Sequence, residues 1–63
     1  MNFIRKKREL INITQQQLAD MLESDRTTVS KWENGKSFPD ITTFVKLSKY
    51  FNCTVDDLLK VSI

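Results

Sequence analysis

Apolar residues recur along this chain at helical spacing, and the β-branched residues never build a clear alternating run of the kind that marks a strand. Glycine and proline occur once each, so little interrupts the helical segments. The first predicted helix runs from about Phe3 to Asn12, with Ile4 and Ile11 on one face. Asparagine tolerates the left-handed conformation that terminates helices, so we expect the first helix to end at Asn12.

The second predicted helix begins at Thr14. Thr14 and Gln17 have the spacing of a capping box, in which each side chain satisfies the free backbone amide of the other residue. Leu18 and Leu22 then mark a buried face at positions i and i+4, with Ala19 beside them.

The third predicted helix follows after a very short connection at Glu23-Ser24. Asp25 has the side chain of a helix cap, the helix runs through Asn34, and Gly35 supplies the positive φ angle that stops it. A connection of two or three residues forces the two helices to cross sharply. Residues 14–34 are therefore predicted to form a helix-turn-helix.

Two further helices are expected in the last third of the chain. Lys36 to Pro39 form a loop, and Asp40 caps a fourth helix whose inward residues are Phe44, Leu47 and Phe51. Asn52-Cys53 turns the chain. Thr54 and Asp57 repeat the capping-box spacing ahead of a short fifth helix, whose apolar residues are Val55, Leu58 and Leu59.

Size and composition limit what this chain can be. Its 63 residues make one domain, 1–63, and a domain this small buries only about 60% of its unfolded surface, so its stability is marginal. Cys53 is the only cysteine and there is no histidine, which excludes an intrachain disulfide and disfavours a zinc site. The remaining sources of stability are efficient helix packing and, in addition, dimerisation.

The formal net charge of +2 is too small to indicate nucleic acid by itself, but its distribution is more informative. A basic run covers residues 5–8, and Arg26, Lys31 and Lys36 follow at wider intervals. A run of this kind is most often a solvated helix face. No apolar stretch reaches membrane-spanning length and the first residues lack the apolar core of a signal peptide, so we expect a cytoplasmic protein without a membrane partner.

Residues 14–35 read TQQQLADMLESDRTTVSKWENG. This segment resembles the Cro/C1-type (XRE-like) helix-turn-helix family, whose usual pattern is close to TQ-x-x-LA-x-x-x-G-V-S-x-x-x-I-S-x-W/I-E-x-G. The similarity continues through Pro39 to residues 55–59, so it covers nearly the whole chain. It implies an all-α, five-helix lambda-repressor-like domain in which helices two and three form the helix-turn-helix. The implied function is that of a sequence-specific transcriptional regulator, a repressor of bacterial or phage origin.

Three positions depart from the family pattern. Glu23 stands where relatives have the turn glycine, so either this residue adopts a strained φ angle or the turn differs. Ser24 replaces a buried valine, and Asn12 replaces a glycine at the end of the first helix. The resemblance also implies a partly buried ion pair between Arg8 and Glu33 that braces the helix-turn-helix.

In this family the third helix, here about residues 25–34, lies in the major groove with its first residues facing base edges. Val29 and Trp32 are expected to face the core, which leaves the opposite side of the helix for DNA. The residues predicted to read bases are Arg26, Thr27, Lys31, Ser30 and Thr28. The residues predicted to contact phosphate are Gln15, Asn34, Lys36 and Arg8.

Three other side chains are candidates for a functional role, and a structural role is preferred for each. Trp32 has the spacing of a core residue rather than of a base-stacking platform. Cys53 is expected to be an inert buried thiol, and Tyr50 a partly exposed helix residue. We therefore expect no metal site, no cofactor and no small-molecule ligand.

The leading hypothesis is a homodimer that binds a palindromic operator in double-stranded DNA, with half-sites about 34 Å apart. The apolar C-terminal residues assigned to the dimer interface are Leu59, Val61 and Ile63. The alternative is a protein-interaction module of the same fold, of the antitoxin or anti-repressor type. An enzyme is disfavoured because the chain has no histidine, and its single glycine cannot form a phosphate-binding loop.

Overall fold

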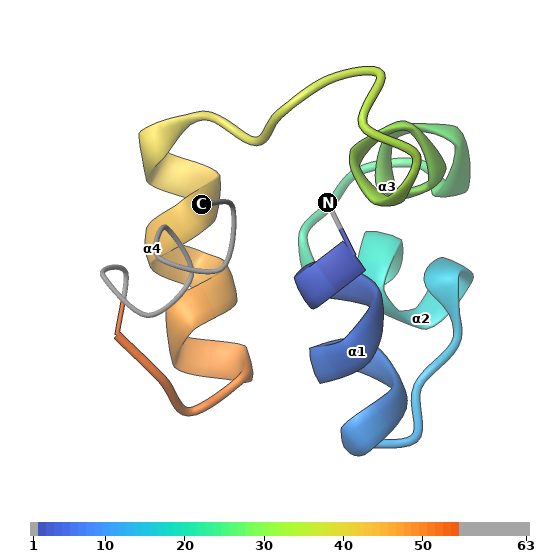
Figure 1. Cartoon of the computed structure of the whole chain (residues 1–63). Coiled ribbons are helices and arrows are strands. Elements are labelled where there is room, and N and C mark those ends of the chain that lie inside the picture. Colours follow the sequence, from blue (N-terminus) through green and yellow to red (C-terminus); the bar gives the residue numbers. More distant parts are fainter. Residues whose placement is uncertain (1, 55–63) are drawn as a thin grey trace.

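The structure, a computed structural model, describes residues 2–54, and within that range it contains four helices and no strand. The helices are α1 (Asn2–Leu10), α2 (Gln15–Met21), α3 (Arg26–Glu33) and α4 (Ile41–Tyr50) (Figure 1). For these residues, the prediction of an all-α fold with a helix-turn-helix made by the second and third helices is confirmed. Residues 55–59 of the predicted fifth helix lie outside the described residues, as do the predicted dimer residues Leu59, Val61 and Ile63.

The starts of three helices are set by the capping side chains that the sequence predicts. Thr14 Oγ1 accepts a hydrogen bond from Gln17 N at 3.0 Å, and Gln17 Oε1 accepts one from Thr14 N at 2.8 Å, which completes a capping box. Asp25 and Asp40 each accept a hydrogen bond from the backbone amide three residues ahead, at 2.8 Å, and so cap α3 and α4.

Left-handed residues mark the points where the chain leaves a helix. Asn12 (φ 59°) and Gly35 (φ 73°) occupy the two positions expected for them, and Asn52 (φ 54°) begins the turn after α4. Glu23 also adopts a positive φ of 56°. The turn therefore keeps a left-handed residue without its glycine, a conformation that costs about 1–2 kcal/mol for most side chains.

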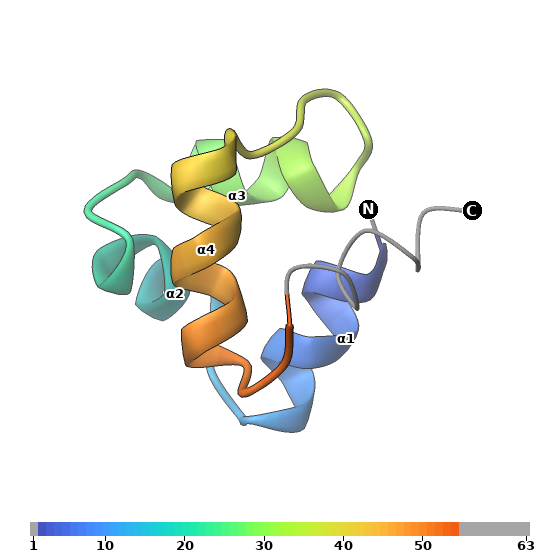
Figure 2. The same cartoon turned by 90° about the vertical axis from the view of Figure 1, so that its left-hand side faces the viewer.

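One apolar core unites the four helices. α1 and α2 both lie close to α3, while α4 stands along one side of the molecule and is reached through the loop at 36–39 (Figures 1 and 2). Trp32 is buried, as expected of a core residue, and Phe44, Leu47 and Phe51 face inward from the fourth helix. The buried apolar side chains are Phe3, Ile4, Leu18, Ala19, Leu22, Val29, Trp32, Phe44, Leu47 and Phe51.

Two predictions about burial are wrong. Ile11 does not share the buried face of Ile4: α1 ends at Leu10, so the face of that helix no longer continues at Ile11, and its side chain is 39% exposed. Ile13 packs against the core instead. Cys53 is only half-buried, because it lies at the edge of the core where the chain turns after α4.

Candidate nucleic-acid interface

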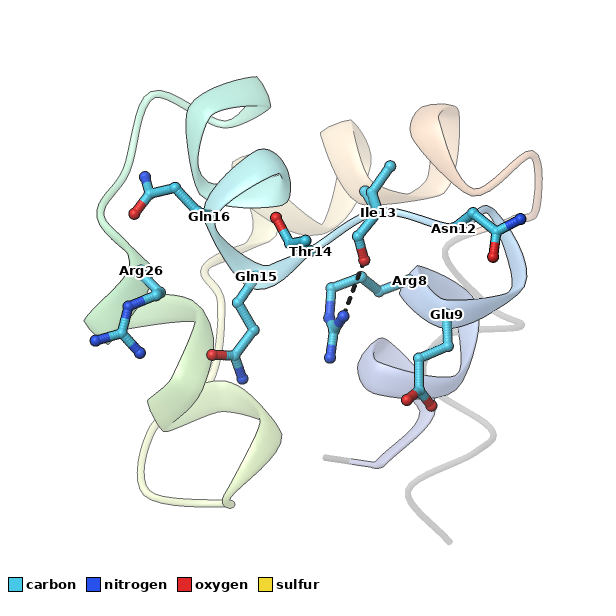
Figure 3. A pocket seen from close by; sticks show the side chains of 8 residues that line it. All are labelled: Arg8, Glu9, Asn12, Ile13, Thr14, Gln15, Gln16 and Arg26. Carbon is cyan, nitrogen blue, oxygen red and sulfur yellow. Dashed lines mark hydrogen bonds between the residues drawn. The ribbon is translucent and has the colours of Figure 1, made fainter.

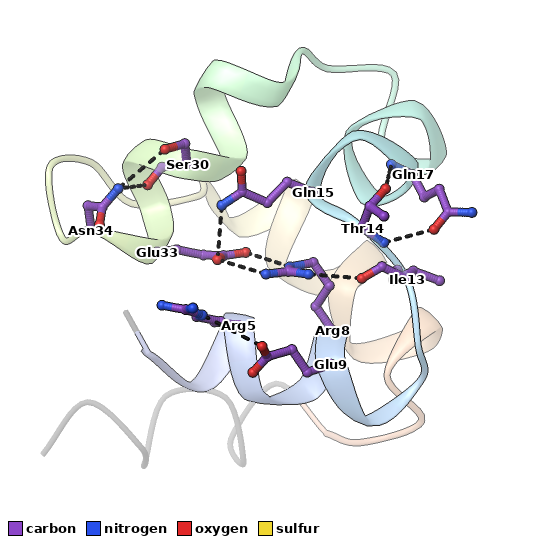
Figure 4. Close-up of polar contacts among 10 residues, drawn as sticks. All are labelled: Arg5, Arg8, Glu9, Ile13, Thr14, Gln15, Gln17, Ser30, Glu33 and Asn34. Carbon is purple, nitrogen blue, oxygen red and sulfur yellow. Dashed lines mark hydrogen bonds and ion pairs between the residues drawn. The ribbon is translucent and has the colours of Figure 1, made fainter.

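A buried ion pair lies at the centre of the molecule's polar contacts (Figure 4). Arg8 Nε donates to Glu33 Oε2 at 2.8 Å and Arg8 Nη2 donates to Glu33 Oε1 at 3.2 Å, in the two-point geometry that arginine and carboxylate favour. The two side chains are only 12% and 4% exposed. The hydrogen bond to Glu33 raises the pKa of Arg8, against the opposing effect of burial, so the guanidinium stays charged.

The same two side chains also hold the start of α2. Arg8 Nη1 donates to the carbonyl of Ile13 at 2.9 Å, and Glu33 Oε1 accepts a hydrogen bond from Gln15 Nε2 at 3.1 Å. Figure 4 shows Gln15 and Arg8 meeting the Glu33 carboxylate from α2 and α1. The end of α3 is thereby fixed against both of the preceding helices.

An open hollow lies between the end of α1, the start of α2 and Arg26 at the start of α3 (Figure 3). Arg26 reaches its rim from α3, and Gln15 and Gln16 reach it from α2. Its other lining residues are Arg8, Glu9, Asn12, Ile13 and Thr14. The hollow therefore brings two residues predicted to contact phosphate, Gln15 and Arg8, next to one predicted to read a base.

The outer side of α3 carries the exposed residues Arg26, Thr27 and Lys31. None of the three side chains makes a hydrogen bond or ion pair with a residue of the described chain. Val29 and Trp32 are buried on the opposite side of this helix. The exposed residues are thus available to an external partner on a helix that is firmly anchored from behind.

Thr28 and Ser30 differ from these three residues because both are half-buried and already hydrogen-bonded. Thr28 Oγ1 donates to Asp25 Oδ1 at 2.7 Å. This bond is the main reason why the pKa of Asp25 is lowered, and the backbone amide of Thr28 adds to the effect. Ser30 Oγ accepts a hydrogen bond from Asn34 Nδ2 at 3.2 Å.

The remaining two predicted phosphate ligands follow the end of α3. Asn34 is exposed, and its Nδ2 also donates to the carbonyl of Ser30 at 2.9 Å. Lys36 is exposed too, and its backbone amide bonds to the carbonyl of Lys31 at 2.9 Å. The two residues therefore lie together at the opposite end of α3 from Arg26.

Besides the bond from Gln15 to Glu33, two features of this region escape sequence analysis. Gln16 lines the hollow, and its place beside Gln15 in the first turn of α2 is a signal that was available. The second feature is a hydrogen bond of 3.0 Å from the Tyr50 hydroxyl to the carbonyl of Met21, which joins α4 to the end of α2. Nothing in the sequence pattern connects residues 29 positions apart in this way.

Within residues 2–54 no cluster of three or more histidine, cysteine or acidic side chains is arranged to hold a metal ion. No helix in that part of the chain has the length and apolar character needed to cross a bilayer.

Two short helices joined by a tight turn, with the outer face of the second one exposed, define a helix-turn-helix unit. Residues 4–58 match the model of the helix-turn-helix family, so this chain belongs to the helix-turn-helix family of the Cro/C1 (XRE) type, whose members are DNA-binding transcription regulators. This membership also confirms the prediction that the chain is not an enzyme.

Curated relatives agree with this assignment. The chain is 48% identical over 48 residues (76% of the chain) to the HTH-type transcriptional activator BcrR of Enterococcus faecalis. It is 39% identical over 57 residues (90%) to the SPbeta prophage-derived uncharacterized HTH-type transcriptional regulator YonR of Bacillus subtilis. It is 31% identical over 55 residues (87%) to the cryptic phage CTXphi transcriptional repressor RstR of Vibrio cholerae.

The matched segment spans 24% of the enterococcal protein, 53% of the Bacillus protein and 49% of the Vibrio protein. No solved structure matches the chain.

Proposed function

We propose that this chain binds double-stranded DNA in a sequence-specific manner, with the first half of α3 in the major groove. The observation that carries the proposal is the contrast across α3: Arg26, Thr27 and Lys31 are exposed and make no hydrogen bond or ion pair within residues 2–54, while Val29 and Trp32 are buried behind them. A helix anchored on one side with such side chains on the other suits the reading of base edges.

The proposed roles follow from the donor chemistry of each side chain. Arg26 donates two hydrogen bonds to O6 and N7 of a guanine, the commonest specific contact in the major groove. Lys31 donates to a base or a phosphate, and Thr27 contacts a base through its hydroxyl or a thymine through its methyl group. Thr28 and Ser30 contribute less, because their hydroxyl groups already take part in hydrogen bonds within the protein.

Phosphate contacts are proposed at both ends of this surface, where they set the register on the duplex. Gln15 contacts the backbone beside the hollow, and Asn34 and Lys36 contact it beyond the end of α3. Arg8 lines the same hollow, but Glu33 and the carbonyl of Ile13 already engage its guanidinium. We therefore assign Arg8 mainly to holding Gln15 and Glu33 in place.

We propose further that the chain acts as a homodimeric repressor on a palindromic operator in the cytoplasm. Repression needs only that the bound protein occupies a promoter, and one relative is named as a phage repressor. The Cα atoms extend 24 × 23 × 21 Å, so one copy spans less than the distance of about 34 Å between successive major grooves on one side of the duplex. In this proposal, a second copy reads the second half-site.

Selection of bound duplexes from a random DNA pool tests this proposal. The expected result is an enriched site with two inverted halves centred about one helical turn apart. Enrichment of a single unrepeated half would contradict the homodimer and leave DNA binding in place.

A fluorescence titration with mixed-sequence DNA at low salt separates DNA binding from the alternative protein-interaction function. DNA binding predicts an affinity that falls steeply as salt is added, since phosphate contacts release counterions. The absence of salt-sensitive binding would contradict the proposal and favour a protein partner for the same fold.

A further inference from the structure

We infer that Tyr50, which lies outside the helix-turn-helix, is a positioning residue for base recognition. It acts by fixing the position of the N-terminal end of α3. The inference rests on the proposed DNA-binding function and assigns to it a residue on α4. Its basis is the hydrogen bond from the Tyr50 hydroxyl to the backbone carbonyl of Met21 at 3.0 Å.

Met21 is the last residue of α2, so its carbonyl is one of those that a helix end leaves without an intrahelical partner. No backbone amide of the described chain donates to it. The backbone hydrogen bonds of the following turn all return to α2, with Leu22 bonded to Leu18 and Ala19, Glu23 to Asp20, and Ser24 to Ala19. Within residues 2–54, Tyr50 therefore supplies the polar tie between this turn and α4.

The backbone of the turn itself is strained, so a contact that holds it matters. Glu23 is held at a φ of 56°, a conformation that glycine adopts without penalty and glutamate does not. The neighbouring Ser24 is exposed and so adds nothing to the core on that side. Of the turn residues 22–24 only Leu22 packs in the core, so a strained turn of this kind is held more firmly where a further contact fixes the end of the preceding helix.

Tyr50 is well placed to hold it. Leu47 in α4 and Phe51, which caps the end of α4, are core residues, and this fixes the backbone that carries the tyrosine ring. Tyr50 as a whole is 41% exposed, and its hydroxyl reaches the end of α2. The two ends of α3 are then held by different contacts. The bonds of Glu33 hold its C-terminal end, and the Tyr50–Met21 bond holds the turn before its N-terminal end.

This arrangement predicts a selective effect on DNA binding. Without the hydroxyl, the last turn of α2 frays more readily and the start of α3 samples more positions, whereas Glu33 still fixes its end. Arg26 and Thr27 lie at the start and would lose alignment with base edges. Lys36 lies beyond the end and would keep its phosphate contact.

The test compares the parent chain with Tyr50→Phe, which removes only the hydroxyl. Affinities are measured for the selected operator and for a scrambled duplex of equal length, at several salt concentrations and at a temperature where both proteins are fully folded. We expect operator affinity to fall about three- to tenfold, the fold-change that one hydrogen bond supports. Affinity for scrambled DNA and the salt dependence should stay unchanged.

Ser48→Ala is the matched control, because it removes a hydroxyl from the same helix. Ser48 Oγ donates to the carbonyl of Val45 within α4 at 2.7 Å, so its hydrogen bond stays inside that helix. We expect this variant to keep the full preference for the operator. An equal loss in Ser48→Ala and Tyr50→Phe would reduce the effect to a general weakening of α4 and overturn the inference.

Glu23→Gly tests whether the effect passes through the turn. Glycine adopts the left-handed conformation freely, so the turn should need less support and Tyr50→Phe should cost less in this background. An undiminished loss in the double variant would overturn the inference, as would unchanged operator preference in Tyr50→Phe alone. If the parent itself showed no preference for any duplex, the proposed function would fail instead, and these results are distinguishable.

Discussion

The two ends of α3 differ in burial and in the contacts that hold them. At its end, Trp32 and Glu33 are buried, and Glu33 is bonded to Arg8 and Gln15 from two other helices. At its start, Arg26 and Thr27 are exposed, and the main polar interaction is the local cap by Asp25. The difference shows that stability and recognition are divided along the helix, so substitutions at the two ends should have separable effects.

The largest effect is expected at the buried end. Glu33→Ala leaves the Arg8 guanidinium buried without its counter-charge and should lower the free energy of unfolding by about 3–5 kcal/mol. In a domain this small, such a loss approaches the total stability. Urea denaturation followed by circular dichroism measures it.

Glu9→Ala is the control for that experiment. Glu9 pairs with Arg5 at 3.8 Å, but both side chains are about 60% exposed (62% and 58% for Arg5 and Glu9), so its removal should cost about 1 kcal/mol or less. Equal losses in the two variants would show that the buried pair has no special part in anchoring α3.

The next effect is expected at the exposed end. Arg26→Ala should reduce operator affinity by about 1–3 kcal/mol and relax discrimination at one base pair, since it removes a two-point contact with guanine. Its free energy of unfolding should stay close to that of the parent, because the exposed side chain makes no hydrogen bond or ion pair within the described part of the chain. Competition binding with single-base operator variants provides the measurement, and retention of full discrimination would refute the role given to Arg26.

A smaller and more uniform effect is expected beyond the end of α3. Lys36→Ala should weaken binding to operator and scrambled DNA alike and lower the slope of log affinity against log salt by about 1, because one phosphate contact is lost. Titrations over a range of salt concentrations test this. A loss confined to the operator would mean that Lys36 reads a base.

The smallest effect concerns the cap at the start of α3. The Thr28 hydroxyl lowers the pKa of Asp25 below its ordinary value of 3.8, so Asp25 contributes stability that is present above that value and is lost as the pH falls through its lowered pKa. Thr28→Val should move the pKa of Asp25 back towards the ordinary value. Titration of the Asp25 carboxyl carbon by NMR follows the shift, and an identical titration in both proteins would contradict the assigned cause.

Local chemistry could be predicted well from this sequence, because capping depends on residues three positions apart. Thr14 with Gln17, Asp25 and Asp40 begin helices where their side chains suggest. Ile11 was misjudged because its buried or exposed state depends on where α1 ends, and helical spacing alone does not define that point.

Contacts between distant segments were harder to predict. The ion pair of Arg8 with Glu33 follows from the family resemblance rather than from any pattern of spacing. The Tyr50–Met21 bond had no such guide, because it depends on how the end of one helix lies against another. The bond from Gln15 to Glu33 was missed for the same reason, since it joins residues 18 positions apart.

The position of Arg8 outside residues 14–34 has a consequence for protein engineering. Transplanting that segment alone into a foreign scaffold would leave Glu33 with no cation and would uncover Leu18 and Val29 to water. A functional graft would have to import an arginine at the equivalent point in space, or replace the carboxylate by an apolar side chain together with its lost partner. The recognition unit is therefore not portable as residues 14–34 alone, because it depends on α1 for the Arg8 ion pair and on α4 for core packing and the Tyr50 contact.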